Sequence, residues 1–285
     1  IDVQVFPMGT LGGTSDIIEM VHAGSVNIVF SDFAWMGSFV PYAHIFAIHG
    51  LWPKEGYAEI IEWIVANGES FKIMQKAFEG RGYHLMNIYT NGWIWWTSTK
   101  PINTPQDLRG YVMRTQSSKL MIAGMEALGA SPVATEWSEV YGALELGLID
   151  GQVSTVIGHY NSKFYEVSDY LYQPYTQIYM NMPVANLEWW NSLDAKTRTF
   201  VSGFMASEIP AMADWVDQME KKAVENILKE KPKMVIHEFT EAERAPFVEL
   251  VKPTHQIFVD FVGAGSKELL DAFMRDVENA KRAVK

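Results

Sequence analysis

The chain has 285 residues, of which 48% are apolar and 13% aromatic, so it can bury a sizeable core in about two domains. Its 23 lysines and arginines against 34 aspartates and glutamates leave a formal net charge of −11, and an acidic surface repels nucleic acid and anionic lipid. There is no cysteine, which excludes disulfides, thiolate catalysis and cysteine metal ligands, and no apolar run of about 18 residues that would span a membrane.

Short strands alternate with helices in the first half of the chain, which is typical of an α/β fold. Apolar runs and alternating patterns predict strands at residues 3–6, 26–30, 83–89, 93–98, 111–115, 149–156, 177–186 and 233–239. Helical spacing and capping residues predict helices from 16 to 24 and over 57–78, 118–128, 138–146 and 162–171. Pro183 makes the strand at 177–186 an edge strand or a crossover.

Two starting points are especially clear. Residues 1–6 alternate like a strand already under way, so we interpret the sequence as a mature or trimmed product. A turn over 9–15 follows. Further along, Thr104-Pro105-Gln106-Asp107 predicts a helix start, with Thr104 as the cap, Pro105 at the first position and Asp107 completing a capping box.

The pattern changes in the last third of the chain. Residues 194–229 are mostly helical in character, with Pro210 as an expected kink, and further helices begin at Thr240 and Ser266. A helix of this length predicts a strut across two lobes, with the chain crossing between them more than once.

Signatures of catalysis are missing from the sequence. There is no G-x-S-x-G elbow, no P-loop and no H-E-x-x-H motif, and the turn over 9–13 lacks the spacing of a dinucleotide-binding loop. The seven histidines are scattered, and the closest pair, His44 and His49, does not stack on one helix face. We therefore expect no metal, no cofactor and no enzyme activity.

A series of motifs in a fixed order carries the functional signal. In order they are Phe6-Pro7-Met8-Gly9-Thr10-Leu11-Gly12, Asn91-Gly92-Trp93-Ile94-Trp95-Trp96, Thr104-Pro105-Gln106-Asp107-Leu108-Arg109-Gly110, Val112-Met113-Arg114, Gly129-Ala130-Ser131-Pro132-Val133, Ser138-Glu139-Val140-Tyr141-Gly142, Asp150-Gly151-Gln152 and Lys163-Phe164-Tyr165-Glu166-Val167. This order closely resembles the extracytoplasmic solute-binding subunits of tripartite ATP-independent periplasmic (TRAP) transporters, the C4-dicarboxylate-binding-protein-like (DctP) family.

The resemblance implies an α/β fold of the two-lobed periplasmic-binding-protein clamshell type, with a long helix spanning both lobes. It implies lobe I at residues 1–91 plus 180–219 and lobe II at 92–179 plus 220–285, with the family's first strand and helix, some thirty residues, absent. The role implied is that of a periplasmic, monomeric receptor. It would bind a small organic acid in the cleft and deliver it to a membrane permease, with no cofactor and no nucleic acid.

Arg114 is the first candidate for ligand contact. It stands at the end of the predicted strand at 111–115, at the position where the family that this chain resembles keeps an arginine that grips the ligand carboxylate. A guanidinium offers a rigid fork for two carboxylate oxygens and stays charged when it is desolvated. We expect this contact to contribute about 1.5–3 kcal/mol in a dry cleft.

Three departures from the family pattern predict the kind of acid. Members that bind sialic acid carry a second cleft arginine where this chain has Ile94, many members have an asparagine where it has Ser154, and Trp137 replaces a smaller apolar residue. The pocket is therefore expected to be less polar and to suit a monocarboxylate with an apolar or planar body. A dicarboxylate or sugar acid would leave polar groups unpaired there, which is costly.

Further cleft candidates come from aromatic and polar residues nearby. Trp35 and Trp93 are candidates for an aromatic wall that stacks on the ligand. Asp32 follows the predicted strand at 26–30, where family members place a polar cleft residue. Gln177 and Asn181 lie on the strand that is expected to cross between the lobes.

Two other functions remain open on the sequence. The same clamshell could hand its closed form to a signalling partner instead of a permease. A two-lobed enzyme is the second alternative, against which the missing acid–base and nucleophile signatures count.

Overall fold

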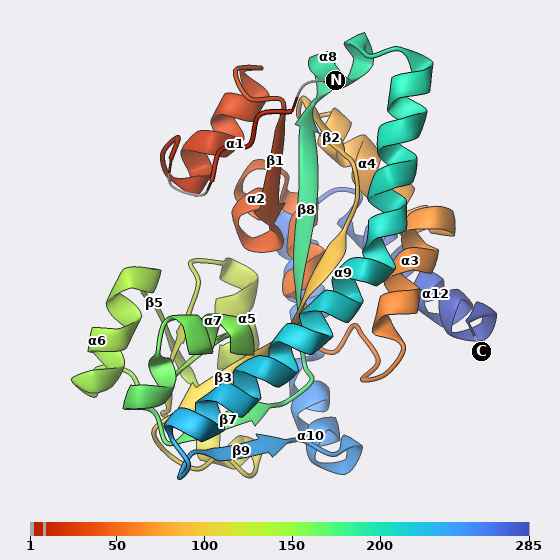
Figure 1. Cartoon of the computed structure of the whole chain (residues 1–285). Coiled ribbons are helices and arrows are strands. Elements are labelled where there is room, and N and C mark those ends of the chain that lie inside the picture. Colours follow the sequence, from red (N-terminus) through yellow and green to blue (C-terminus); the bar gives the residue numbers. More distant parts are fainter. Residues whose placement is uncertain (1–2, 8–9, 285) are drawn as a thin grey trace.

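The protein is built around a mixed β-sheet (Figure 1). It is seen here in a computed structural model that describes residues 3–7 and 10–284. Its strands are β1 (Ile28–Asp32), β2 (Tyr83–Leu85), β3 (Tyr89–Ser98), β4 (Val112–Thr115), β5 (Ser131–Ala134), β6 (Gly151–Thr155), β7 (Tyr170–Gln173), β8 (Ile178–Asn186) and β9 (Val235–Glu238). The strand order is β1-β8-β3-β6-β4-β5, with β2 beside β8, and β7 between β3 and β9. Parallel and antiparallel pairs both occur, as expected for an α/β fold.

Strands β3 and β8 join the two lobes. The first part of β3 pairs with β8, which also pairs with β1 and β2 of the first lobe. From Ile94 onward, β3 instead pairs with β6 and β7 of the second lobe. The sequence therefore crosses between the lobes on these two strands, as Figure 1 shows for the long ribbons of β3 and β8.

Pro183 lies in the middle of β8, opposite Phe30 of β1. The carbonyl oxygen of Pro183 accepts from the backbone N–H of Met86, which lies between β2 and β3. The N–H and C=O positions of a strand residue point to the same side, so the missing N–H of Pro183 also faces this break between β2 and β3. Of the two expected roles, crossover is confirmed and edge strand is wrong, because the neighbouring chain is interrupted where proline cannot donate.

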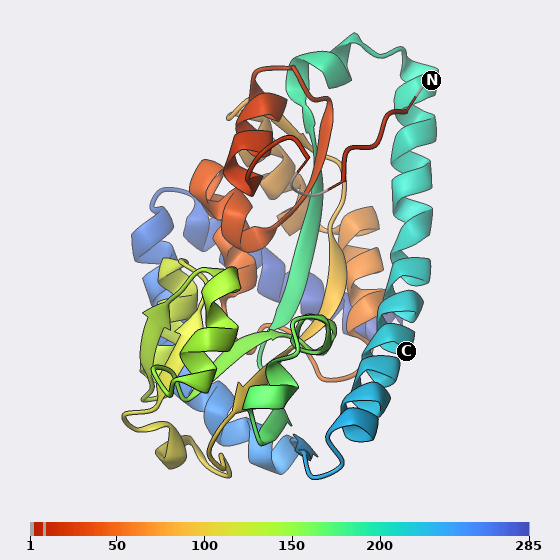
Figure 2. The same ribbon diagram turned by 60° about the vertical axis from the view of Figure 1, so that its left-hand side comes forward.

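Helices cover both lobes (Figures 1 and 2). They are α1 (Thr14–His22), α2 (Phe33–Phe39), α3 (Tyr57–Asn67), α4 (Glu69–Glu79), α5 (Lys119–Ala127), α6 (Val140–Glu145), α7 (Val156–Asn161), α8 (Leu187–Ser192), α9 (Ala195–Glu230), α10 (Glu241–Val251), α11 (Pro253–Val262) and α12 (Ser266–Ala283). Four 3₁₀ segments complete the described chain: η1 (Pro41–Ala47), η2 (Pro105–Leu108), η3 (Trp137–Glu139) and η4 (Phe164–Val167).

The predicted long helix is confirmed as α9, which begins at the Asp194 cap and continues through Pro210 to Glu230. In both views it runs alongside the two lobes, and it contacts α3 of the first and α7 of the second (Figures 1 and 2). The helix continues past Pro210 instead of ending there, because its hydrogen bonds are kept on both sides of the proline.

Three local predictions differ from the structure. Residues 3–6 form no strand, and Val3 and Val5 are exposed; residues 1, 2, 8 and 9 of that segment lie outside the described ranges. The capping box at Thr104 is present, but it opens only the single 3₁₀ turn η2. The helix expected at 162–171 is wrong, because Lys163 has a positive φ of 58° and the chain continues as η4 and β7.

The helix predicted over 57–78 is divided at Gly68 into α3 and α4. Asp276 of α12 explains the division, since its carboxylate accepts from the backbone N–H and the hydroxyl of Ser70 at 2.8 and 2.6 Å. A Cβ at Gly68 would lie 2.9 Å from the same carboxylate. A residue far away in the sequence thus caps the start of α4.

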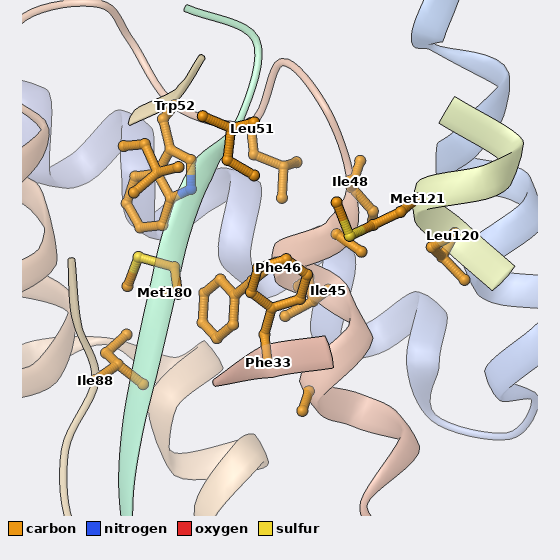
Figure 3. Packing of buried hydrophobic residues seen from close by; sticks show 14 of the residues in the cluster. Phe33, Ile45, Phe46, Ile48, Leu51, Trp52, Ile88, Leu120, Met121 and Met180 are labelled. Atoms are coloured by element: carbon orange, nitrogen blue, oxygen red, sulfur yellow. The ribbon is translucent and has the colours of Figure 1, made fainter. Parts of the chain in front are cut away.

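Helix α12 therefore packs on the first lobe. Phe273 meets Phe46 and Trp52 edge to face, with ring centroids 6.0 and 5.1 Å apart, in the cluster partly drawn in Figure 3. The expected division assigned all of 220–285 to the second lobe. That assignment is wrong for α12, because its amphipathic face finds its apolar partner on α3 and α4.

Replacing Phe273 by alanine should lower the free energy of unfolding by about 3–5 kcal/mol, because a ring that is fully buried leaves a cavity. Met274 on the same helix is 40% exposed, and Met274→Ala should change the value by less than about 0.5 kcal/mol. Urea unfolding measures both. Equal effects would contradict the packing described for α12.

Four histidines are held neutral inside the fold. Burial lowers the pKa of His44, His49, His84 and His159 to about 4 in each case. Because the unfolded side chains titrate near 6.5, the unfolded chain binds more protons between those two pH values. The free energy of unfolding therefore falls as the pH falls through this window.

The melting temperature should accordingly decrease from pH 7 to pH 5, with a loss on the order of 1–2 kcal/mol for each histidine at pH 5. Burial raises the pKa of the Asp32 and Glu220 carboxyls, which act in the opposite direction but are outnumbered. Substituting buried His44 by glutamine should flatten the slope, and substituting exposed His22 should not. A melting temperature independent of pH in this range would contradict the assignment.

Candidate ligand-binding site

Arg114 lies on β4 with its side chain almost completely buried, at 3% exposure. Its Nε and Nη2 atoms both donate to the carbonyl oxygen of Thr135, at 2.8 and 2.6 Å. This contact occupies one edge of the guanidinium. The buried Nη1 has no hydrogen-bond partner among the described residues, so the opposite edge is available for a ligand.

The charge of Arg114 is costly where it stands. Burial lowers its pKa to about 10, although the nearby Glu136 and Tyr179 raise it. The guanidinium therefore remains charged at neutral pH. A buried cation with an unsatisfied donor is unfavourable until an anion compensates it, which a ligand carboxylate could do.

Arg244 provides an internal comparison, as the second arginine that is buried in the described chain. Its Nε donates to the carbonyl of Tyr175 at 2.7 Å, its Nη2 to the carbonyl of Trp52 at 2.9 Å, and its Nη1 pairs with Glu241 at 2.9 Å. Every nitrogen of that guanidinium is used within the fold. Arg244 thus connects the segments of Tyr175 and Trp52, whereas Nη1 of Arg114 has no partner among the described residues.

Trp137, on η3, lies beside this cation. Its ring centre is 5.5 Å from the guanidinium carbon of Arg114, within the range of a cation–π contact. The indole N–H donates to the Ser162 hydroxyl at 3.0 Å, and the ring packs against Phe164 at 4.9 Å. These contacts fix the ring, while 38% of the residue is still exposed and available to a ligand.

Ser154, on β6, meets the same group of residues at helix α7. A Cβ at Gly158 would lie 2.9 Å from the Ser154 hydroxyl oxygen and 3.5 Å from the Trp137 ring, so both side chains converge on this glycine. The structure therefore brings three predicted residues together in the second lobe: Arg114, Trp137 and Ser154.

The first lobe contributes Asp32 through Tyr179. The Tyr179 hydroxyl donates to Asp32 at 2.8 Å, and the electrostatic influence of Arg114 reaches the same phenol. Asp32 also caps α2, since its other oxygen accepts from the backbone N–H groups of Ala34 and Trp35. Burial raises the pKa of Asp32, and these hydrogen bonds lower it.

Asn181 and Trp35 lie near Asp32. Asn181 is paired in register with Asp32 on one side and with Tyr89 on the other, so the three side chains share one face of the sheet. Trp35 is 41% exposed at the start of α2. Asp32, Asn181 and Trp35 thus lie together on the first-lobe side of the Arg114 site, next to Tyr179.

Trp93, Ile94 and Gln177 do not join this group. Trp93 is buried between Tyr57 and Tyr175, at 5.5 and 5.3 Å, on the face of the sheet away from Tyr179. Ile94 is part of the main hydrophobic cluster. The Gln177 amide nitrogen donates to the carbonyl of Phe46 at 3.3 Å. These positions favour core packing over ligand contact, because all three residues are buried and their neighbours include Tyr57 and Phe46 of the core.

Two contributors were missed as site residues from the sequence. Thr135 contributes its backbone carbonyl, which every residue has, so its residue type could not indicate the contact with Arg114. Gln116 lies two positions after Arg114 and adjoins Tyr179, and its side-chain oxygen is buried without a hydrogen-bond partner. The two-residue period of a strand could have indicated that Gln116 follows Arg114 on the same side.

Two open depressions lie elsewhere on the surface. One of about 580 Å³ is lined by residues that include His22, Arg81 and Tyr83, and one of about 460 Å³ by residues that include Pro105 and Pro246. Neither contains a member of the Arg114 group. The chemistry of the unpaired guanidinium, and not the size of a depression, therefore locates the site.

The described ranges 3–7 and 10–284 contain no group of three or more histidine, aspartate or glutamate side chains arranged to hold a metal ion. In the same ranges, no helix is long and apolar enough to cross a bilayer.

Comparison with known proteins identifies the class. The model of the family described as bacterial extracellular solute-binding protein, family 7 (DctP) matches residues 1–260, and the chain belongs to this family. It is an extracytoplasmic solute-binding protein of the TRAP type, and its α/β fold is the two-lobed one of that family. Its relatives are receptors for small organic acids, and it is a binding protein, not an enzyme.

Three relatives place the chain more closely. It is 26% identical over 278 residues to the ectoine/5-hydroxyectoine-binding periplasmic protein UehA of Ruegeria pomeroyi, covering 97% of this chain and 81% of the relative. The apo open structure of a TRAP periplasmic solute-binding protein from Marinobacter aquaeolei VT8 matches with a TM-score of 0.89 at 28% identity, over 96% of this chain and 88% of that one. A second, from Desulfovibrio salexigens with bound orotic acid, has a TM-score of 0.87 at 28% identity, over 97% and 88%.

Proposed function

We propose that this protein is the periplasmic receptor of a TRAP transporter for a monocarboxylate with a planar or apolar body. It takes up the acid between its lobes and delivers it to a membrane permease, acting as a monomer. One observation carries the proposal: Arg114 is a buried guanidinium with one edge occupied by a backbone carbonyl and Nη1 left without a partner.

A carboxylate is the ligand group that fits this arrangement. It would accept from Nη1 and from the remaining hydrogen of Nη2, as two short charge-assisted hydrogen bonds. The contact would also neutralise the buried charge, which is why a single anionic group could bind strongly here.

The surroundings favour a single carboxylate on a flat body. Arg244, the other buried arginine of the described chain, is fully engaged elsewhere, so it offers no second cation to a ligand. Trp137 and Trp35 both keep exposed ring surface, one on each lobe. Ectoine and orotic acid, which the names of two relatives mention, are both monocarboxylic acids built on a six-membered ring. A ligand of this kind would use one cation and stack on the indoles.

Binding would draw the lobes together. Arg114 and Trp137 belong to the second lobe, whereas Asp32, Trp35 and Asn181 belong to the first. A solute held by Arg114 gains contacts with the second set only when the hinge closes, so it stabilises the closed form. The closed form is the one that would dock on the permease.

Thermal-shift measurements over small carboxylic acids test the ligand class. Orotate or ectoine should raise the melting temperature more than succinate or glucuronate, because the site offers one cation and aromatic surface. A ligand at 100 times its dissociation constant adds about 2.7 kcal/mol of stability. A larger shift with succinate or with the sugar acid would contradict the proposed monocarboxylate.

Replacing Arg114 by alanine should weaken binding of the acid that gives the largest shift by at least tenfold, or about 1.4 kcal/mol, as measured by calorimetry. The melting temperature without ligand should fall little, because the guanidinium is only partly satisfied in the fold. Arg109→Ala removes the same charge from an exposed position and serves as the control. Unchanged affinity in the Arg114 variant would rule out the proposed role.

A further inference from the structure

The point where the chain passes from one lobe to the other on β3 has an unusual backbone. The pairing of β3 with β8 is irregular between Thr90 and Trp93, and pairing with β6 begins at the next residue, Ile94. Gly92 occupies this gap with a φ of 93°, a conformation that side chains other than glycine rarely adopt. Its N–H donates to the Thr90 hydroxyl at 2.9 Å, which closes the bulge on itself.

Glu220 of the long helix α9 is seated directly on this glycine. A Cβ added to Gly92 would lie 2.3 Å from one carboxyl oxygen of Glu220, 2.9 Å from its carboxyl carbon and 3.1 Å from Val216. The space above the bulge is therefore filled by the Glu220 carboxyl, and only glycine leaves room for it.

Helix α9 changes lobes at the same place. Less than one turn before Glu220, Asp217 accepts from the Tyr57 hydroxyl of α3 in the first lobe at 3.0 Å. Less than one turn after it, Ala223 begins the cluster that α9 forms with Trp95 and Val156 of the second lobe. Two of the connections between the lobes, β3 and α9, thus touch each other through Glu220 and Gly92.

The groups that face Glu220 are acidic or neutral. They are Asp217 on α9 itself, Tyr57 on α3, Tyr175 in the loop before β8, and Glu238 on β9. The cation of Lys54 lies over the Tyr175 ring, with its Nζ 4.2 Å from the ring centre, and it donates to the carbonyl oxygen of Phe239.

Burial and this acidic surrounding raise the pKa of Glu220 to about 8, although the N–H groups of Trp95 and Trp93 lower it. The neutral carboxyl packs on Gly92 without placing a charge there, although its Oε1 atom has no hydrogen-bond partner among the described residues. The carboxylate is repelled by Asp217 and Glu238 and is drawn toward water.

Resting on the proposed solute receptor, we propose that Glu220 is a positioning residue for solute binding: its neutral carboxyl, seated on Gly92, holds the angle between the lobes, and loss of its proton releases the hinge. Glu220 and Gly92 would set the fraction of molecules whose lobes are at the angle that can bind solute. The apparent affinity changes with this fraction, although neither residue contacts the solute.

Distances between the lobes test the proposal without any solute. Because the chain has no cysteine, Ser38→Cys on α2 and Glu145→Cys on α6 would carry spin labels at two exposed positions only. Pulsed electron paramagnetic resonance should give a narrow distance distribution at pH 6 and a broader or shifted one at pH 9, with a midpoint near pH 8.

Variants separate the effect of the Glu220–Gly92 contact from a general effect of pH on the distance between the lobes. In Glu220→Gln, a neutral amide replaces the carboxyl, so the narrow distribution should persist at both pH values. Gly92→Ala should give the broad distribution at both, because the added methyl displaces Glu220. Gly110→Ala introduces the same strain at a φ of 69° where nothing lies within 4 Å, and it should behave like the parent protein.

Superimposable distributions of the parent protein at pH 6 and pH 9 would overturn the proposal, and so would an equal pH response in Glu220→Gln. If Gly92→Ala does not fold, the comparison of parent and Glu220→Gln still decides. Since no ligand is present, a failure here leaves the proposed ligand class untouched, and a failure of the ligand screen leaves this result untouched.

Discussion

The interaction on which the proposed binding depends is the partial satisfaction of one buried guanidinium, that of Arg114. Thr135 takes the Nε and Nη2 hydrogens of Arg114 through a single backbone carbonyl, which orients the group but does not neutralise it. In a low-dielectric surrounding, an oriented and unpaired charge is a strong attractor for the one partner that fits. Arg244 shows that the same fold satisfies a buried arginine fully where no ligand is needed.

In the proposed site, the two lobes would share the recognition of the ligand. The cation and one indole stand on the second lobe, and a hydrogen-bonded pair of Tyr179 and Asp32 stands at the border of the first. The connections that carry them are β3, β8 and α9, and the chain also passes from β9 of the second lobe to α12 of the first through α10 and α11. In the proposed closure, the bulge at Gly92 is a backbone position of special weight, because the Glu220 carboxyl is packed directly on it.

Much of the secondary structure could be predicted from local patterns. The strands around residues 28–32, 112–115 and 151–155 and the long helix after Asp194 follow from apolar runs and caps. Predictions failed where a distant partner decides. Asp276 caps α4 from the other end of the chain, Lys163 turns the chain out of a helix, and residues 3–6 have no neighbouring strand among the described residues.

Sequence alone determined the family and the two-lobed α/β class, and it predicted Arg114 as a ligand contact, because motif order and strand position are local properties of the chain. It could not separate Trp93 from Trp137, which are the same residue type, yet Trp93 is buried between Tyr57 and Tyr175 whereas Trp137 lies against the guanidinium of Arg114. Nor could it find Thr135, which contributes only a carbonyl, or the seat of Glu220 on Gly92, 128 positions apart in the chain. Only the tertiary structure decided these, because orientation and contact between distant segments arise when the lobes pack.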